Sequence, residues 1–446
     1  MAGSTATATP RSDTADTTSP ARDRRLLGSL VFLGLFLFYA ISTTPFYDLT
    51  LPASASIDTN NSSKLNQILF LALPSLSLIG ALITSMRGRL LEPRWLLAII
   101  FIWLVFTGIL SSHSFNSLKA LFLTTLVVVS ANACLLLPRS DAHFAKLLSV
   151  GILCSIGLCY YGIRFLPNLS IHSAQDVAEP MLAGAWRGYF AHKNDAAAAM
   201  VLFSFCGLYI FRVWSRAVGV LILATAVFFL AHTGGKTATA MLPAVVLVAF
   251  VVERFAWTRI PIAFGGVGAL NLLAVGSAMS PGLAGIVRSL GIDPTFTNRS
   301  DIWRLATNAI SHSPIFGYGQ KAFWRTEELV YGGEGLETWA VQASHAHNSY
   351  VEMILIGGFP LLFLSLIWFF IYPLRSLARI DRAGGMSHTG RLFLRIWLYM
   401  IFTTCLESLL YESSSGYLMG WFMFCMSLFG LNYEASADHI EREPAR

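Results

Sequence analysis

The chain has 446 residues, of which 55% are hydrophobic and only 13% are charged, whereas a soluble globular protein is about 25% charged. This deficit, spread over long apolar runs, excludes a soluble enzyme, a nucleic-acid-binding protein and a disordered scaffold. The net charge of +6 is better explained by membrane topology than by acidic partners. The six cysteines lie in apolar stretches without metal-ligand spacing, so no disulfide framework is expected.

Long apolar segments recur along the whole chain. A membrane span needs about 20 mainly apolar residues to cross roughly 30 Å of hydrocarbon. The sequence therefore predicts an all-α polytopic membrane protein with about twelve transmembrane helices. These spans are expected at 26–44, 66–86, 95–112, 118–137, 144–166, 195–211, 217–232, 237–252, 260–279, 348–372, 393–409 and 415–432.

Basic residues orient these spans, because Lys and Arg accumulate in cytoplasmic loops. With the amino terminus inside, 20 of the 31 Lys and Arg residues lie in inner segments, leaving 11 elsewhere. Both termini are therefore expected to be cytoplasmic.

The expected organisation has three parts. Residues 1–25 are rich in Ser, Thr and Ala and are predicted to be a disordered cytoplasmic tail. Residues 26–432 form the transmembrane domain, including a large outer loop at 281–347, and 433–446 form a second cytoplasmic tail. Residues 53–55 (Ala-Ser-Ala) resemble a signal-peptidase site, but the apolar region before them is longer than that of a usual signal peptide.

Polar residues gather outside the predicted spans. Asp195, Glu352 and Glu407 all lie near span ends. The other polar residues are concentrated in the outer segments 164–194, 231–237 and 281–347. A loop as long as the last, and not of turn-only composition, is usually functional, so a site at the outer surface is favoured over an ion path through the middle.

The first outer cluster, residues 187–194, places cations at the start of a predicted helix. Arg187, His192, Lys193 and Asn194 could hold an anion there, because free N–H groups and the helix dipole favour negative charge. Alternatively, Asn194 caps the helix while Arg187 and Lys193 reach toward lipid headgroups.

The second cluster is the short turn His232-Thr233-Gly234-Gly235-Lys236-Thr237. It lacks the spacing and the preceding strand of a nucleotide-binding P-loop, so an ATP site is rejected. Lys236 could contact a phosphate or simply extend to the membrane surface.

The third cluster begins a helix at Arg299, with apolar positions at helical spacing across 302–310. A cation in the first turn opposes the helix dipole, a cost that shrinks if Arg299 faces a bound anion. Pro314 is expected to end this helix. Gly317 and Gly319 then form a turn where backbone can approach a ligand.

The outer loop ends in a pair of histidines before the tenth predicted span. Ser349 and Glu352 match an S-x-x-E capping box, which places His347 just outside the helix and next to Arg299. A histidine there can exchange a proton near neutral pH. Interfacial packing is an alternative, and His345 with His347 could bind a metal, but no carboxylate or cysteine at ligand spacing joins them.

Together these pieces resemble the O-antigen ligase and polysaccharide polymerase (Wzy-type) superfamily, nearest to its exopolysaccharide-production, ExoQ-like branch. The resemblance covers roughly residues 180–365 and rests on the order and spacing of short motifs within the twelve-span frame. The motifs are Arg187 to Asn194, Arg299-Ser300-Asp301-Ile302-Trp303, Pro314-Ile315-Phe316-Gly317-Tyr318-Gly319 and His347-Asn348-Ser349-Tyr350-Val351-Glu352.

The resemblance implies a metal-independent glycosyltransferase whose donor is an undecaprenyl-pyrophosphate-linked oligosaccharide and whose acceptor is a glycan or a lipid. Arg299 would bind the donor pyrophosphate and His347 would activate or orient the acceptor hydroxyl. Lys236 stands where ligases of this group usually carry Arg, and Lys offers no bidentate fork. Further substrate contacts are expected from Arg187, His192, Lys193, Asn194, Lys236, Trp303, Gly317, Gly319, His345 and Asn348.

This chemistry fits the outer face of the chain. Preorganised cations stabilise the charge that develops on a pyrophosphate leaving group without a metal. Aromatic side chains could stack on sugars, although Trp and Tyr also anchor membrane interfaces. These aromatic residues are Trp186, Tyr189, Trp303, Trp324 and Trp339.

The resemblance also implies a place in the bacterial inner membrane, with a periplasmic site for surface-polysaccharide biosynthesis. No metal or other cofactor and no nucleic acid is expected, while membrane lipids and a chain-length regulator are candidate partners. Polymerase is favoured over ligase, and the sugar, linkage and oligomeric state stay open. The alternative is a transporter or flippase of lipid-linked sugars, which should carry charged or broken helices near the midplane.

Overall fold

The computed structural model describes residues 19–41, 45–51, 64–177, 179–331, 339–413 and 418–436. Within these residues the regular structure is helical, apart from one isolated antiparallel bridge between Ile171 and Trp186. The predicted all-α fold is confirmed.

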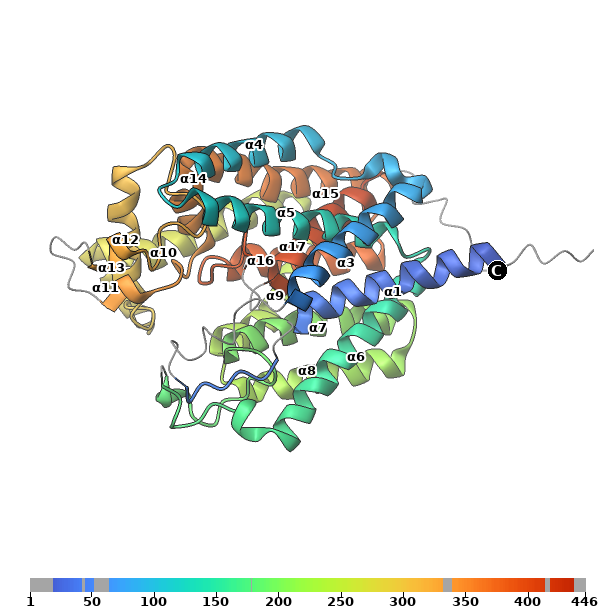
Figure 1. The fold of residues 1–446 in the computed structure, drawn as a ribbon, viewed down its shortest axis with the longest axis horizontal. Coiled ribbons are helices and arrows are strands. Elements are labelled where there is room, and N and C mark those ends of the chain that lie inside the picture. Colours follow the sequence, from blue (N-terminus) through green and yellow to red (C-terminus); the bar gives the residue numbers. More distant parts are fainter. Residues whose placement is uncertain are drawn as a thin grey trace, which may run out of the picture.

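Each of the twelve predicted segments coincides with helical structure (Figure 1). The first six are α1 (Ser19–Ile41), α3 (Lys64–Ile83), α4 (Arg94–Leu110), α5 (Ser114–Leu136), α6 (Asp141–Phe165) and α7 (Lys193–Val213). The rest are α8 (Arg216–Thr233), α9 (Lys236–Arg254), η5 with α10 (Pro261–Gly266, Val267–Met279), α14 with η7 and α15 (Ser349–Leu366, Ile367–Ile371, Tyr372–Arg382), α16 (His388–Thr403) and α17 (Leu418–Glu434). Short 3-10 turns lie at Ser85–Arg89, Pro167–Leu169, Pro180–Leu182 and Ala256–Thr258.

Eight helical segments of the described chain are long and apolar enough to cross a membrane. The apolar parts of α1 and α4, and the helices α16 and α17, are shorter. The polytopic membrane character is therefore confirmed, while the count of twelve stays a prediction. Helix α1 begins at Ser19, inside the segment predicted to be a disordered tail. The predicted cleavage site at 53–55 lies outside the described residues.

The outer loop is built from short helices gathered at one end of the bundle, on the left of Figure 1. They are α11 (Pro281–Ser289), α12 (Arg299–His312), α13 (Glu327–Tyr331) and the 3-10 turn η6 (Trp339–Gln342). The apolar face of α12 predicted from its spacing is buried, because Ile302, Leu305 and Ala306 pack in a small core with Leu355 of α14. This core holds the loop against the membrane-spanning bundle.

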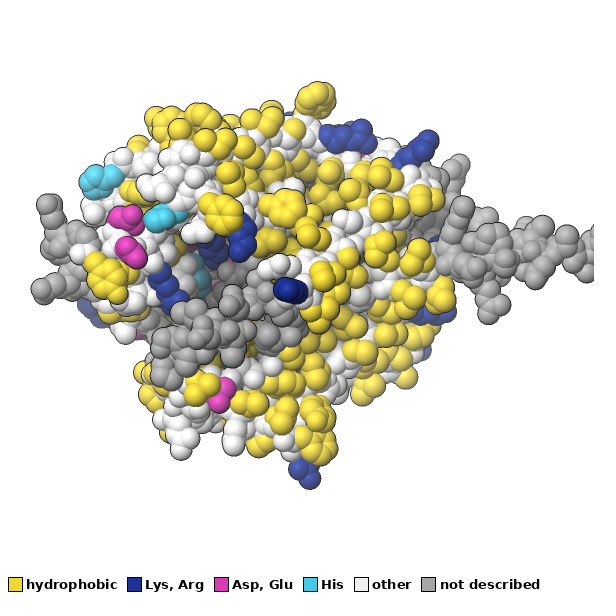
Figure 2. Space-filling model, viewed as in Figure 1, with side chains coloured by type: hydrophobic (Ala, Val, Ile, Leu, Met, Phe, Trp, Pro, Cys, Tyr) yellow, Lys and Arg dark blue, Asp and Glu magenta, His cyan; other side chains and the backbone are white. Residues whose placement is uncertain are grey.

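Helices α16 and α17 form the centre of the bundle. Nearly all of their side chains are buried, and they pack on each other, with α5 and α7 among their neighbours. By contrast, only 22% of α3 and 17% of α9 is buried. Apolar side chains cover most of the surface in Figure 2, whereas histidines and acidic residues appear at the end that carries the outer loop. The exposed apolar surface is the expected contact with lipid.

Helix α14 is broken eight residues after its start. Gly357 has φ −145° and Gly358 has φ +69°. A Cβ at Gly358 would lie 1.9 Å from the Ile315 carbonyl oxygen, so only glycine fits. This break was not predicted, because the segment is uniformly apolar.

The outer loop satisfies the backbone groups that the break exposes. Tyr318 and Gly319 donate from their backbone nitrogens to the carbonyls of Leu355 (2.7 Å) and Ile356 (3.0 Å). The Trp103 indole donates to Gly357 at 2.7 Å. Unpaired backbone groups at membrane depth are costly, so these contacts stabilise a fixed joint between the loop and α14.

Candidate functional site

Arg299 is the first residue of α12, at the polar end of the bundle. The preceding residue, Asn298, adopts the left-handed conformation with φ +66°. Asparagine tolerates this conformation better than most residues, so the chain can turn sharply before the helix. The Trp303 indole, one turn later, donates to the Ala346 carbonyl at 2.9 Å. This bond fixes the start of α12 next to the segment that carries His347.

His347 lies just outside α14, as predicted, and is also left-handed, with φ +50°. The predicted S-x-x-E capping box is wrong. The cap is Asn348, whose side-chain oxygen accepts from the backbone nitrogens of Tyr350 and Val351, because Asn is as effective a cap as Ser. Strained backbone conformations are over-represented at functional sites.

The segment 404–410, which follows α16, holds the start of α14 in place. The Ser349 hydroxyl donates to the Glu407 carbonyl and accepts from the backbone of Leu409, both at 2.9 Å. The backbone nitrogen of Asn348 donates to the Ser408 hydroxyl at 3.1 Å. These bonds bring His347 and Glu407 side by side.

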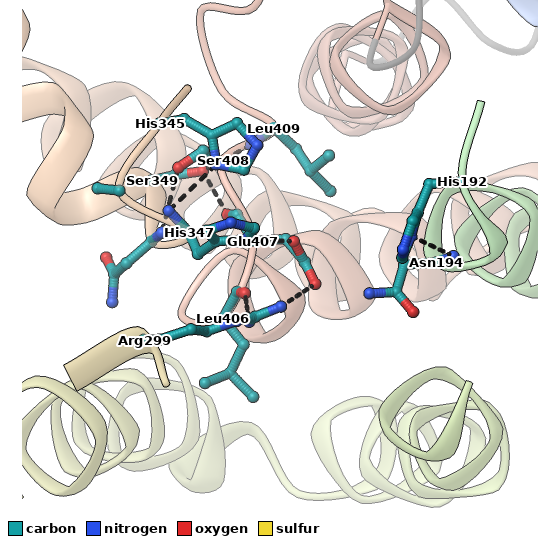
Figure 3. A network of polar contacts seen from close by, with 12 residues as sticks. His192, Asn194, Arg299, His345, His347, Ser349, Leu406, Glu407, Ser408 and Leu409 are labelled. Atoms are coloured by element: carbon teal, nitrogen blue, oxygen red, sulfur yellow. Dashed lines mark hydrogen bonds and ion pairs between the residues drawn. The ribbon is translucent and has the colours of Figure 1, made fainter. Parts of the chain in front are cut away.

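Glu407 joins the two predicted catalytic residues (Figure 3). Its Oε1 accepts from Arg299 Nη2 at 2.9 Å, and its Oε2 lies 3.5 Å from His347 Nδ1. Arg299 also donates through Nη1 to the Leu406 carbonyl. The expectation that Arg299 and His347 lie together is met, but through a carboxylate to which the sequence analysis gave no role.

The network is partly open to solvent and strongly polarised. The exposed fractions are 17% for the Arg299 side chain, 23% for Glu407 and 30% for His347. Burial raises the pKa of the Glu407 carboxyl, but Arg299 and His347 outweigh this effect and the pKa falls to about 2. Glu407 is therefore an anion at any physiological pH.

The geometry defines the roles of the two His347 nitrogens. Nδ1 has no exposed surface, although 30% of the side chain is exposed. A carboxylate beside Nδ1 favours the tautomer with its proton on that nitrogen. Nε2 is then the proton acceptor of the ring.

His192 and Asn194 form the facing wall, and the Asn194 amide points toward Glu407 (Figure 3). His192 caps α7 by accepting from the Asn194 backbone at 3.1 Å, so Asn194 is not the cap. Burial lowers the pKa of His192, but nearby carboxylates raise it above its usual value. The strongest of these is Glu179, 2.9 Å from His192 Nε2.

His345 stands behind His347, with ring centroids 4.1 Å apart. Its Nδ1 accepts from the His347 backbone nitrogen at 3.2 Å. Burial, with the neighbouring His347, lowers the pKa of His345 to about 3. His345 is therefore neutral at working pH and supports His347 rather than exchanging protons.

The two lysines predicted to contact substrate lie at neighbouring helix starts. Lys193 Nζ donates to the Gly234 carbonyl at 3.4 Å, linking the start of α7 to the turn before α9. Lys236 begins α9 and is exposed. Both cations lie at the ends of helices whose dipoles also favour anions.

The position of Arg187 differs from both predicted roles, which were anion binding and contact with lipid headgroups. It has no exposed surface, and it donates to the carbonyls of Phe190 (3.0 Å) and Tyr47 (2.5 Å). It therefore holds the loop before α7 through backbone carbonyls.

Several other predicted contact residues support the site from beneath. Trp303 and Asn348 have no exposed surface, and the Asn348 amide donates to Asn271 and Cys405. A Cβ at Gly317 would meet the backbone of α14, and one at Gly319 would meet the side chains of Ser111 and Ser117. A buried ring or amide that is already paired has no surface left for a sugar.

The other aromatic candidates have mixed surroundings. Trp186 stacks on His232 with centroids 4.3 Å apart, Tyr189 is buried, and Trp324 donates to Glu352. Trp339 is half-exposed and remains available for stacking.

No group of three or more metal-ligating side chains occurs among the described residues. The site's charged groups are instead paired with one another. Metal independence stays a prediction.

Two comparisons with known proteins bear on this site. The O-antigen ligase family matches residues 219–366, which include Arg299 and His347. The exopolysaccharide production protein ExoQ of Rhizobium meliloti (strain 1021) is 26% identical over 228 residues, covering 44% of this chain and 48% of the relative. The chain thus spans about half the length of this curated relative. The resemblance inferred from the motifs is confirmed.

Proposed function

We propose that this protein is a membrane enzyme of bacterial surface-polysaccharide biosynthesis that joins lipid-linked glycans, as a polymerase rather than a ligase. The donor is an undecaprenyl-pyrophosphate-linked glycan and the acceptor is a second glycan. The site faces the periplasm. The observation that carries this proposal is the convergence of Arg299 and His347 on Glu407, at the polar end of an apolar bundle.

The arrangement supports a direct transfer. His347 Nε2 accepts the proton of the acceptor hydroxyl, whose oxygen forms a bond to the anomeric carbon of the donor. The bond between that carbon and the pyrophosphate oxygen breaks, and undecaprenyl pyrophosphate leaves. Arg299 stabilises the negative charge that develops on the leaving group, while His347 supplies base catalysis.

The break in helix α14 does not support the alternative function, a flippase. Transporters use exposed backbone groups at such breaks to coordinate substrates and ions. In this chain the loop residues 314–319 and Trp103 pair with those groups.

The test is the size distribution of lipid-linked glycan in cells whose only copy carries His347→Ala. Accumulation of single repeats on the lipid is expected of a polymerase. Full-length polymer retained on the lipid would instead mean a ligase. An unchanged distribution, with normal protein levels in the membrane, would contradict the proposed role of His347.

A further inference from the structure

Arg299 already has protein partners in this structure. Its Nη2 binds Glu407 Oε1 at 2.9 Å and its Nη1 donates to the Leu406 carbonyl. Only 17% of the side chain is exposed. The cation that should bind the donor pyrophosphate is therefore engaged with a carboxylate.

This pairing neutralises the charge of Arg299. Arg299 contributes one positive charge and Glu407 one negative charge, while Asp195 on α7 adds a further carboxyl group within electrostatic reach of Glu407. A pyrophosphate that approaches Arg299 meets the Glu407 carboxylate at close range. Like charges at this distance repel, so both anions cannot share Arg299 without cost.

Glu407 has a second partner within reach. Its other oxygen, Oε2, lies 3.5 Å from His347 Nδ1, just beyond a good hydrogen bond. A small rotation of the carboxylate toward His347 would shorten this contact and release Arg299. The Ser349 hydroxyl holds the Glu407 carbonyl and the Leu409 backbone nitrogen, so the side chain can move without the segment.

We propose that Glu407 is a positioning residue that passes from Arg299 to His347 when the donor pyrophosphate binds. The donor takes over Arg299, and the released carboxylate holds the Nδ1 proton of His347, which makes Nε2 a stronger base. The acceptor hydroxyl is thus activated only when a donor is in place. This inference rests on the proposed function and adds an order of events to it.

One consequence concerns the basicity of His347. Without the donor, Glu407 stays on Arg299 and Nε2 is the weaker base. Nε2 becomes the stronger base only when the donor, with its anomeric carbon, is bound. The proton of the acceptor moves to Nε2, and the Nδ1 proton stays on the ring, hydrogen-bonded to Glu407. Glu407 accepts this hydrogen bond as a carboxylate and takes up no proton.

The decisive variant is Glu407→Gln, compared with Glu253→Gln as a matched control. Glu253 pairs with Arg391 near the carboxyl end of α9, the end opposite to the one that Lys236 begins. The protein is studied in nanodiscs, with undecaprenyl pyrophosphate as the binding probe and the lipid-linked repeat as substrate. We expect Glu407→Gln to bind the probe about fivefold more tightly, the effect of removing one competing ion pair. Its kcat should fall by about 10- to 100-fold, as for other groups that orient a functional histidine.

This split between affinity and turnover would not arise from a merely structural role. A carboxylate that only supports the fold would weaken probe binding when removed, together with kcat. Unchanged or weaker probe binding by a monodisperse Glu407→Gln protein would therefore overturn the proposal. Loss of activity in His347→Ala tests the proposed function separately, so the two failures are distinguishable.

A second measurement needs no change at Glu407. In the wild-type protein, the 15N resonance of His347 Nδ1 should shift on saturation with undecaprenyl pyrophosphate, because its hydrogen bond to Glu407 shortens. The resonance is assigned by its absence in His347→Gln. A resonance that does not move at saturation would refute the transfer of Glu407.

Discussion

The two ends of the helix bundle use the same residue types for different purposes. At the end opposite the outer loop, Arg259 and Asp381 form a two-pronged pair, at 2.6 and 3.0 Å. At the other end, Arg299 gives Glu407 a single bond, and the second carboxylate oxygen is directed at His347. The inner pair satisfies its own charges, whereas the outer network retains capacity for another partner.

This difference separates structural from functional ion pairs better than burial does. Arg259 is buried, and the Asp381 side chain is 42% exposed; Arg259 binds both Asp381 oxygens and donates its remaining Nε–H to the Val252 carbonyl at 3.0 Å. Arg299 and Glu407 are less unequal in exposure, but they share their charges with a histidine and a carbonyl. A pair whose members are shared among several partners can be rearranged by a ligand.

The largest effect is expected from Arg299→Ala. Loss of the cation removes stabilisation of the leaving group and should lower kcat by about 10²- to 10³-fold. The rate of undecaprenyl pyrophosphate release from the lipid-linked repeat measures this. Arg391→Ala at the inner end is the control and should keep wild-type turnover; equal losses in the two variants would erase the contrast between the ends.

Arg299→Lys should have an intermediate effect. Lysine keeps the charge but not the planar fork with which Arg299 serves the Leu406 carbonyl and one anionic partner. We expect kcat to fall by about tenfold, the size of one lost charged hydrogen bond, while the protein stays monodisperse. A Lys variant as inactive as the Ala variant would show that geometry, not charge, dominates at this position.

Asp381→Asn tests the inner pair and should affect stability alone. It leaves buried Arg259 without a counter-ion, and we expect a loss of about 2 kcal/mol, less than for a fully buried pair because Asp381 is half-exposed. Thermal unfolding followed by tryptophan fluorescence measures this loss. Turnover per folded molecule should equal that of the wild type; reduced turnover would mean that the two ends communicate.

The smallest effect is expected from His345→Gln. With a pKa of about 3, folded His345 is neutral at working pH, so the acidic midpoint of the pH–rate profile should not move. Below pH 6.5 the unfolded chain binds a proton that the folded chain does not, so wild-type His345 reduces stability as the pH falls through 6.5. The variant should therefore lose less stability on acidification, and a displaced rate midpoint would reassign the titrating group to His345.

Much of the fold follows from local sequence. Long apolar runs and helical spacing predict the twelve helical segments and the buried face of α12, because both depend on residues close in the chain. The break in α14 has no local signal, since Gly357 and Gly358 stand in an apolar run. What requires glycine there is the carbonyl of Ile315, on a different element.

The candidate site, like the fold, could be predicted from local sequence only in part. Arg299 and His347 can be selected from their motifs, but their link passes through Glu407, which lies 108 residues from Arg299. A carboxylate at a span end is a functional candidate by its cost alone, and that was the one available signal. Burial of Arg187 and Asn348 could not be foreseen, because short motifs do not tell whether a polar side chain serves a ligand or the backbone.

The contacts between the outer loop and α14 also determine the order in which parts of the site can form during translation. The loop is translated before the helix whose carbonyls its residues 318 and 319 must reach, so it cannot adopt its final form when it first emerges. Arg299 can pair with Glu407 only after residue 407 has also been translated. The charged centre is thus completed only after α14 and α16 have been translated, and truncation anywhere before residue 407 leaves the site incomplete.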